Sequence, residues 1–355
     1  MNAQLEAVER AAGATFARFA ERELPACFRG VDSEWAAVRH GCGLLDARFR
    51  GLLRLTGADR TAFAQGMLSN DVARLRDGAG TYAALLTQPG KIVSDLRVYA
   101  LADMLWLDVP AHRREAVRDG LEHHIVADDV ELAVDEAWSP LVALEGPDAV
   151  RTLHALSGEA VDDLEPFAHR EIRIQEHQAR VAAVSHTGES GYLLFGAVEI
   201  GAALWERCRE AGATAVGMCA LDVLRLEAGI PWYGCDMDES FLISEVGLET
   251  AISYKKGCYL GQEVVERVAS RGQVQRKLIG LLCEGRTAPP RDAKLIREGE
   301  EVGWITSAVW SPARKSVIAL GYARRGCWDP GSEVAVGEMQ VAARIVPLPF
   351  YVRPA

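Results

Sequence analysis

Hydrophobic residues recur along this chain with two different periods, which predict where its helices and strands lie. Apolar residues at helical spacing predict helices over residues 5–24, 35–42, 58–68, 113–124, 148–156, 198–210, 221–231 and 263–269. Short apolar or alternating runs predict strands over residues 52–56, 82–87, 91–101, 105–109, 130–134, 141–144, 181–184 and 192–195, with another around Ile172. Turn-forming glycine, proline and aspartate residues separate many of these segments.

The predicted order of elements repeats. A series of strand, helix, strands, helix and strand begins at residue 52, and a similar series begins at residue 141. Two such series predict two related α+β units of the split βαβ type. Beyond residue 276 the runs are all of the strand type and are separated by turns, which is typical of a small β-barrel. We therefore expect three portions, at residues 1–140, 141–275 and 276–355.

Composition limits the classes of protein to which the chain can belong. With 355 residues, of which 49% are apolar, it can bury large cores in more than one domain. Acidic residues outnumber basic ones by 50 to 39, so we expect no nucleic acid partner. No apolar run reaches the ~18 residues of a membrane span, and we expect no membrane partner.

Cysteine usage indicates the compartment. The eight cysteines are scattered and form no Cys-x-x-Cys pair, and the first thirty residues do not resemble a signal peptide. Such cysteines are expected to be reduced thiols, so we predict a cytoplasmic protein.

One cysteine has unusual neighbours, in the run Lys255-Lys256-Gly257-Cys258-Tyr259-Leu260-Gly261-Gln262-Glu263. The glycines allow a sharp turn, and the two lysines would favour the thiolate of Cys258, which is the nucleophilic and metal-binding form. Cys258 is therefore a candidate for a reactive thiol. The alternative is a buried structural thiol.

Two further motifs lie within the repeated units. Asp95 follows the turn Gln88-Pro89-Gly90, at the inner end of a predicted hairpin strand. A carboxylate there could act as a general base or pair with a cationic centre, or it could simply be an outward polar position. The loop His186-Thr187-Gly188-Glu189 either lines a cleft or only connects a hairpin.

The segment after the second unit contains charged residues in a helix that glycine and proline end. Arg225 and Glu227 point to different faces of that helix, so they should not pair with each other. They either fix the following loop or contact a ligand. Asp236-Met237-Asp238 lacks the spacing of a calcium loop, and we expect no metal. The basic stretch 270–277 could bind an anionic group, and it marks a domain boundary.

Three motifs together resemble a known family. The run 256–263, the run 224–231 and Asn70-Asp71-Val72 are similar to the YgfZ branch of the glycine-cleavage T-protein (GcvT) superfamily, over roughly residues 35–346. Members of that branch bind folate and assist iron-sulfur cluster assembly or repair. The resemblance implies a GcvT-like α+β cloverleaf, with two split-βαβ portions around a central folate cavity and a C-terminal β-barrel. It also implies tetrahydrofolate or a derivative as cofactor.

The resemblance leads to a hypothesis for each site residue. Cys258 would be a redox-active or transient cluster-contacting thiol whose pKa Lys256 tunes, while Gln262 and Glu263 would fix the loop at the mouth of the folate cavity. Asp95 would be a further catalytic candidate. The remaining candidates for folate binding are Tyr82, Asn70, Arg225 and Glu227, together with Asp95.

Two functions compete on these motifs. Asp95 matches the T-protein aspartate that positions folate and the aminomethyl group, which favours a tetrahydrofolate-dependent aminomethyltransferase. However, Leu193 replaces the glutamate that holds the pterin, Leu221 replaces an arginine, and T-proteins lack the cysteine at 258. These differences favour a tetrahydrofolate-binding protein that assists iron-sulfur cluster assembly or repair, with iron-sulfur client or assembly proteins as partners. We also expect a monomer. A scaffold that has lost its ligand is the non-enzymatic alternative.

Overall fold

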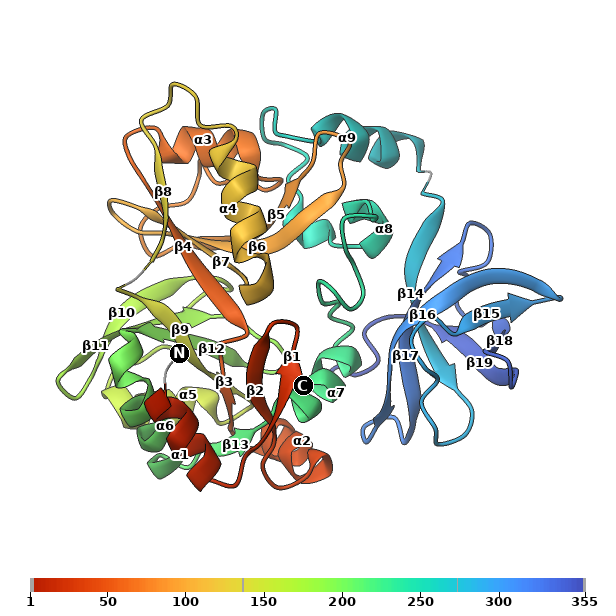
Figure 1. Cartoon of the computed structure of the whole chain (residues 1–355), viewed down its shortest axis with the longest axis horizontal. Coiled ribbons are helices and arrows are strands. Elements are labelled where there is room, and N and C mark those ends of the chain that lie inside the picture. Colours follow the sequence, from red (N-terminus) through yellow and green to blue (C-terminus); the bar gives the residue numbers. More distant parts are fainter. Residues whose placement is uncertain (1–2, 136, 273, 354–355) are drawn as a thin grey trace. The chain divides into compact units, whose positions relative to one another are not determined.

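The computed structural model describes residues 3–135, 137–272 and 274–353 (Figure 1). These residues fall into two compact units. The first unit consists of Met1–Thr87, Val93–Leu221 and Thr250–Leu260, and the second of Gln88–Ile92, Asp222–Glu249 and Gly261–Ala355. The division into portions at residues 140 and 275 stays a prediction.

The first unit contains a five-stranded sheet in the order β5-β6-β7-β4-β8. Two helices pack on this sheet and bury apolar residues of their own, such as Phe63 of α3 and Val117 of α4, in one core with the strands. The elements are β4 (Arg50–Thr56), α3 (Arg60–Met67), β5 (Gly80–Leu86), β6 (Ile92–Ala100), β7 (Leu105–Pro110), η1 (Ala111–Arg113), α4 (Arg114–Glu122) and β8 (Glu131–Val134).

The same unit contains a six-stranded sheet in the order β10-β11-β12-β9-β3-β13. Its core takes in Leu5 of helix α1, Leu153 of α5 and Trp205 of α6. The elements are β3 (Gly43–Asp46), β9 (Ser139–Glu145), α5 (Ala149–Ser157), β10 (His169–Ile174), β11 (His177–Ala183), β12 (Gly191–Gly196), η2 (Val198–Ile200), α6 (Gly201–Glu210) and β13 (Thr214–Val216).

The two sheets have the same strand order, which agrees with the predicted repeat. In the first sheet β4 lies beside β7, and in the second sheet β9 lies beside β12 in the same way. The strands β5, β6, β7, β4 and β8 therefore correspond to β10, β11, β12, β9 and β13. The second sheet differs by one insertion, because β3 lies between β9 and β13 and pairs antiparallel with the former and parallel with the latter. The sequence pattern predicted neither this short strand nor β13.

The long helix predicted over residues 5–24 is wrong beyond its first half. Helix α1 covers Ala3–Ala11, and the chain then turns at Gly13, whose φ of +96° favours glycine. A hairpin follows, formed by β1 (Thr15–Phe19) and β2 (Arg22–Cys27). The apolar residues Phe16 and Phe19 have helical spacing only by coincidence. Helix α2 then covers Val31–His40.

The remaining elements lead from the six-stranded sheet to the barrel. In sequence they are α7 (Met218–Glu227), α8 (Ile243–Val246), η3 (Glu249–Ala251) and α9 (Gln262–Arg271). The barrel is closed in the order β14-β17-β16-β15-β18-β19, from strands β14 (Arg276–Cys283), β15 (Lys294–Arg297), β16 (Glu300–Ser311), β17 (Ser316–Arg324), β18 (Glu333–Val336) and β19 (Val341–Val346). The predicted α+β fold with a C-terminal barrel is thus confirmed.

None of the helices in residues 3–135, 137–272 and 274–353 combines the length and the apolar character that crossing a bilayer requires.

Candidate functional site

Asp95 and Tyr82 meet on neighbouring strands of the five-stranded sheet. The phenol of Tyr82 on β5 donates a hydrogen bond of 3.0 Å to Asp95 Oδ2 on β6. Burial, and then Asp95 itself, raise the pKa of Tyr82 well above its ordinary value, so the phenol keeps its proton and remains a donor. Phe167 stacks on the Tyr82 ring at 6.2 Å between centroids, which fixes the ring's orientation.

The other carboxylate oxygen of Asp95, Oδ1, is a candidate for binding a substrate. Asp95 Oδ1 is buried, and within the described part of the chain it has no hydrogen-bond partner. A buried acceptor without a partner costs free energy, and a ligand that donates a hydrogen bond or carries positive charge would recover that cost. This oxygen therefore fits an amine or a cationic centre of a substrate.

Asn70 connects the same region to the segment that carries Lys256. Its amide Nδ2 donates to the carbonyl oxygens of Tyr82, at 2.7 Å, and of Thr250, at 3.0 Å. Its side-chain oxygen accepts a bond of 2.8 Å from the backbone N–H of Asp71. The NH₂ group and the oxygen of the Asn70 side chain are thus both bonded within the protein. Asn70 therefore fixes the backbone around Tyr82.

Lys256 is a buried cation that binds backbone carbonyls. Its Nζ donates to the carbonyl oxygens of Gln65, Leu68 and Asn70 at 2.5, 2.6 and 2.9 Å. An ammonium group has three N–H donors, so all of them are used. The hypothesis that Lys256 tunes Cys258 therefore finds no support in this geometry, although burial lowers the pKa of Lys256 to about 8.

Four predicted residues are thus joined by hydrogen bonds in the first unit. We call Asp95, Tyr82, Asn70 and Lys256 the Asp95 cluster. Tyr82 bonds the Asp95 carboxylate, Asn70 bonds the carbonyl of Tyr82, and Lys256 bonds the carbonyl of Asn70. Cys258 lies in the same unit but is exposed, and its thiol is free.

The other predicted residues lie in the second unit. Gln262 begins helix α9, where its amide bonds Glu266 Oε1 at 2.6 Å on the surface, and Glu263 is exposed beside it. The cavity-mouth role of these two residues stays a prediction.

Arg225 and Glu227 anchor the segment after α7 rather than pairing with each other. The guanidinium of Arg225 is almost completely buried and forms ion pairs with Asp236 and Asp222. Glu227 accepts a hydrogen bond of 2.5 Å from Ser311 Oγ in the barrel. These contacts agree with the alternative that Arg225 and Glu227 fix the following loop. Their role in folate binding stays a prediction.

Asp236 is likewise committed to this network, where Thr306 and Ser307 donate to its Oδ1 at 2.6 and 2.7 Å. In the described ranges, no three His, Cys, Asp or Glu side chains are grouped so that they could hold a metal ion.

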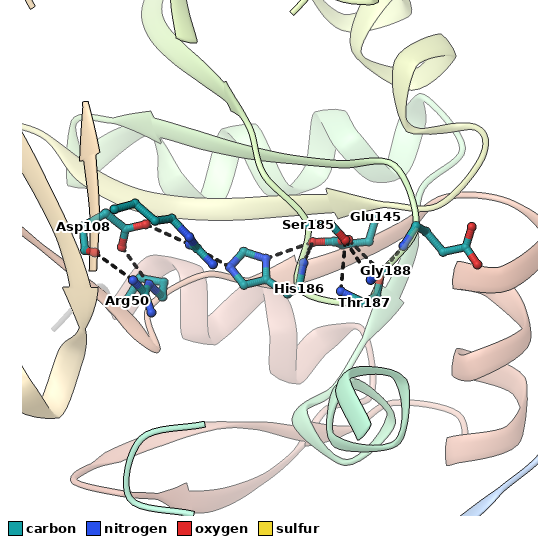
Figure 2. Close-up of polar contacts among 9 residues, drawn as sticks. Arg50, Asp108, Glu145, Ser185, His186, Thr187 and Gly188 are labelled. Atoms are coloured by element: carbon teal, nitrogen blue, oxygen red, sulfur yellow. Dashed lines mark hydrogen bonds and ion pairs between the residues drawn. The ribbon is translucent and has the colours of Figure 1, made fainter. Parts of the chain in front are cut away.

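The sequence pattern pointed to the loop of His186 but missed the line of buried polar and charged side chains to which His186 belongs. Figure 2 shows Arg50 and Asp108 at one end of this line, His186 in the middle and Glu145 at the other end. Arg97 completes the line, because its Nη1 donates to Asp108 Oδ2 at 2.9 Å and to His186 Nε2 at 3.1 Å. The alternation of β6 could have found Arg97, since residues two apart on a strand lie on the same face.

Comparisons with known proteins identify the family. The model of the GCVT N-terminal domain matches residues 5–256, and that of the glycine cleavage T-protein C-terminal barrel domain matches residues 276–351. The chain therefore belongs to the glycine-cleavage T-protein family.

Individual members of this family are similar over nearly their whole length. The chain is 35% identical to an aminomethyltransferase of Rubrobacter xylanophilus over 346 residues, which cover 97% of this chain and 92% of the relative. It is 33% identical to an aminomethyltransferase of a Synechococcus species, with 97% of both chains covered. The crystal structure of the glycine cleavage system aminomethyltransferase T from Bartonella henselae matches with a TM-score of 0.90 and 25% identity, over 98% of this chain and 97% of that chain.

These findings correct the main functional prediction. The superfamily is confirmed, but a protein that assists iron-sulfur cluster assembly or repair is wrong, because the similar full-length relatives are aminomethyltransferases. The YgfZ branch and iron-sulfur partner proteins have no support. The wrong prediction relied on Leu193, Leu221 and the motif that carries Cys258. In the structure Leu193 is an ordinary buried strand residue, and Cys258 is an exposed thiol.

Proposed function

We propose that this chain is a tetrahydrofolate-dependent aminomethyltransferase. The observation that carries the proposal is the open oxygen of Asp95, buried and held in place by Tyr82, in a chain that belongs to the glycine-cleavage T-protein family. Tetrahydrofolate, the predicted cofactor, is the folate that this family uses. Its full-length relatives that carry the name aminomethyltransferase support the reaction class.

The chemistry of the transfer accounts for a carboxylate at this position. In the transfer the aminomethyl carbon forms bonds to two folate nitrogens, while its bond to the amine, which leaves as ammonia, and its bond to the carrier group of the donor both break. The two folate nitrogens lose their protons to these leaving groups, and positive charge develops around the reacting carbon and nitrogens. A fixed carboxylate beside that charge stabilises the transition state more than the ground state. Tyr82 occupies one oxygen of Asp95, so Oδ1 is the atom that faces the reacting group in our proposal.

The substitution Asp95→Asn tests the proposal, because it keeps the size of the side chain and removes its charge. We expect kcat for formation of methylene-tetrahydrofolate from an aminomethyl donor to fall by about 100-fold or more. Asp103→Asn is the matched control, since Asp103 is exposed in the turn between β6 and β7. Equal turnover in the two variants would contradict the role of Asp95, and a wild-type protein without turnover would contradict the function.

The proposed location and oligomeric state of the protein are those expected from its sequence. We keep a cytoplasmic location and a monomeric state as parts of it. The eight cysteines all lie in the described residues and form no disulfide there, which supports a reducing compartment. Cell fractionation and light scattering at several protein concentrations test these two points.

A further inference from the structure

A line of buried polar side chains in the first unit links its two sheets (Figure 2). Arg50 on β4 donates to Asp108 on β7, with 2.7 Å between Nε and Oδ1. Arg97 on β6 donates to the other oxygen of Asp108 and also to Nε2 of His186, in the loop between β11 and β12. His186 Nδ1 in turn lies 2.9 Å from Glu145 Oε1 at the end of β9.

The partners of His186 determine its tautomer and its charge. A guanidinium can only donate, so Nε2 of His186 accepts from Arg97, and Nδ1 carries the hydrogen that it donates to Glu145. Burial, and then the positive charges of Arg97 and Arg50, lower the pKa of His186 well below its ordinary value. His186 is therefore a neutral acceptor for Arg97.

The loop that carries His186 is itself fixed on Glu145. The backbone N–H of His186 donates to Glu145 Oε1 at 2.9 Å, while Thr187 Oγ1 and Ser185 Oγ donate to Oε2 at 2.8 and 3.1 Å. With these bonds in place the imidazole cannot move away from Arg97 without losing several partners. The acceptor that His186 offers is thus a fixed one.

Arg97 lies close to the open carboxylate of the Asp95 cluster. The two residues are two positions apart on β6 and share one face of the sheet. Burial lowers the pKa of Arg97, but Asp108, then Tyr99 and then Asp95 raise it, and the net direction is upward. Asp95 is thus near enough to stabilise the guanidinium, and an arginine beside a carboxylate readily pairs with it. Here Arg97 Nη1 bonds Asp108 and His186, and Asp95 Oδ1 stays open.

We propose that His186 and Asp108 are positioning residues that hold the guanidinium of Arg97 away from Asp95. This inference rests on the proposed function, since its effect is to keep Asp95 Oδ1 available to the substrate. Without the acceptor on His186, Arg97 turns toward Asp95 and pairs with the oxygen that the substrate needs. The family relationship does not provide this role; it follows from the contacts of Arg97 in this chain.

The substitution His186→Phe tests the proposal, because it keeps a flat ring of similar size and removes the acceptor. We expect the affinity for tetrahydrofolate, measured by calorimetry, and kcat/KM each to fall about tenfold. His186→Gln keeps an acceptor and should retain most of both. His123→Phe is the control, since His123 is exposed and directly follows α4.

The double variant His186→Phe/Arg97→Met separates positioning from a structural role. Removal of the arginine removes the competing partner of Asp95, so we expect the double variant to recover most of the affinity that His186→Phe loses. If His186 only supports the fold, the double variant is no better than the single one, and that result overturns the inference. A wild-type protein that binds no tetrahydrofolate overturns the proposed function together with it.

A second pair of variants serves if His186→Phe does not fold, as judged by circular dichroism. Asp108→Asn leaves a single acceptor oxygen for the guanidinium groups of Arg50 and Arg97, so Arg97 is held less firmly. This variant should therefore also weaken tetrahydrofolate binding. Asp108→Asn/Arg97→Met should restore it. Equal affinities for this single and double variant would overturn the inference.

Discussion

Lys256 lies against the end of helix α3 and stabilises it as a charged cap. The last carbonyl groups of a helix have no partners within the helix, and a cation there bonds them directly and also interacts favourably with the helix dipole. Lys256 meets the carbonyl of Gln65 inside α3 and those of Leu68 and Asn70 just beyond it. Through Asn70 this cap also supports the backbone around Tyr82.

The substitution Lys256→Met should therefore destabilise the protein. Methionine fills similar space but leaves three carbonyl groups without their donor, and we expect the free energy of unfolding to fall by about 2–4 kcal/mol. Urea denaturation measures this loss. Lys255→Met is the matched control because Lys255 is exposed. Equal unfolding midpoints for the two variants would show that Lys256 is not a structural cation.

The candidate site could be predicted from single residues only in part. The strand pattern and the family resemblance identified Asp95, Tyr82 and Asn70, which the structure brings together. The same pattern could not show that Lys256 bonds residues nearly two hundred positions away rather than the neighbouring Cys258. A lysine next to a cysteine in sequence says nothing about where its ammonium points in the fold.

At the scale of elements, prediction succeeded where the periodicity within a segment matches its structure. It failed for very short strands and for the hairpin β1-β2, whose apolar residues have helical spacing. The helices and hairpin strands of both repeated units were predicted close to their observed bounds, because their periodicity lies within each segment. Strand β3 was missed because its four residues pair with β9 and β13, which lie far along the chain.

Glu34 shows how one side chain can fix the ends of several elements. Its Oε1 accepts hydrogen bonds from the backbone N–H groups of Phe28 and Arg29, both at 2.7 Å, just before helix α2. Its Oε2 accepts a bond of 2.8 Å from the N–H of Gly217, just before helix α7. The carboxylate therefore holds the starts of two helices that are remote in sequence.

We expect Glu34→Gln to destabilise the protein by about 2 kcal/mol, because the amide NH₂ replaces one acceptor oxygen and faces a backbone donor. Thermal and urea unfolding would measure the loss. Asp32→Asn, on the exposed side of the first turn of α2, changes the charge at the same helix end and serves as the control. A loss of stability in Asp32→Asn as large as in Glu34→Gln would instead point to charge at the helix end as the cause.

For the whole molecule, the fold was predictable but the function was not. The repeated α+β units and the barrel follow from periodicity and turn spacing, and the family comparisons confirm them. The choice between two functions depended on Leu193, Leu221 and the motif that carries Cys258. In the structure Leu193 and Leu221 are buried, in β12 and α7, and Cys258 lies on the surface. Full-length similarity to aminomethyltransferases, and not these residues, corrected the function.

The stability of the whole molecule should also depend on pH through Glu9, which holds helix α1 to the segment before β4. Glu9 is completely buried and lies beside Asp46, and Arg48 bonds both carboxylates. Burial, and then the negative charge of Asp46, raise the pKa of Glu9 to about 9, while Arg48 opposes this rise. In the unfolded chain the same carboxyl group ionises near its ordinary value of 4.5.

The sign of the effect follows from these two pKa values. Between pH 4.5 and about 9 the folded protein binds more protons at Glu9 than the unfolded chain, so the free energy of unfolding falls as pH rises. Glu9→Gln imitates the protonated group and should reduce this fall by something of the order of 2 kcal/mol between pH 5 and 8. Urea denaturation at a series of pH values measures it, with the exposed Glu21→Gln as control. Parallel curves for Glu9→Gln and the wild type would mean that Arg48 keeps Glu9 ionised in the folded protein.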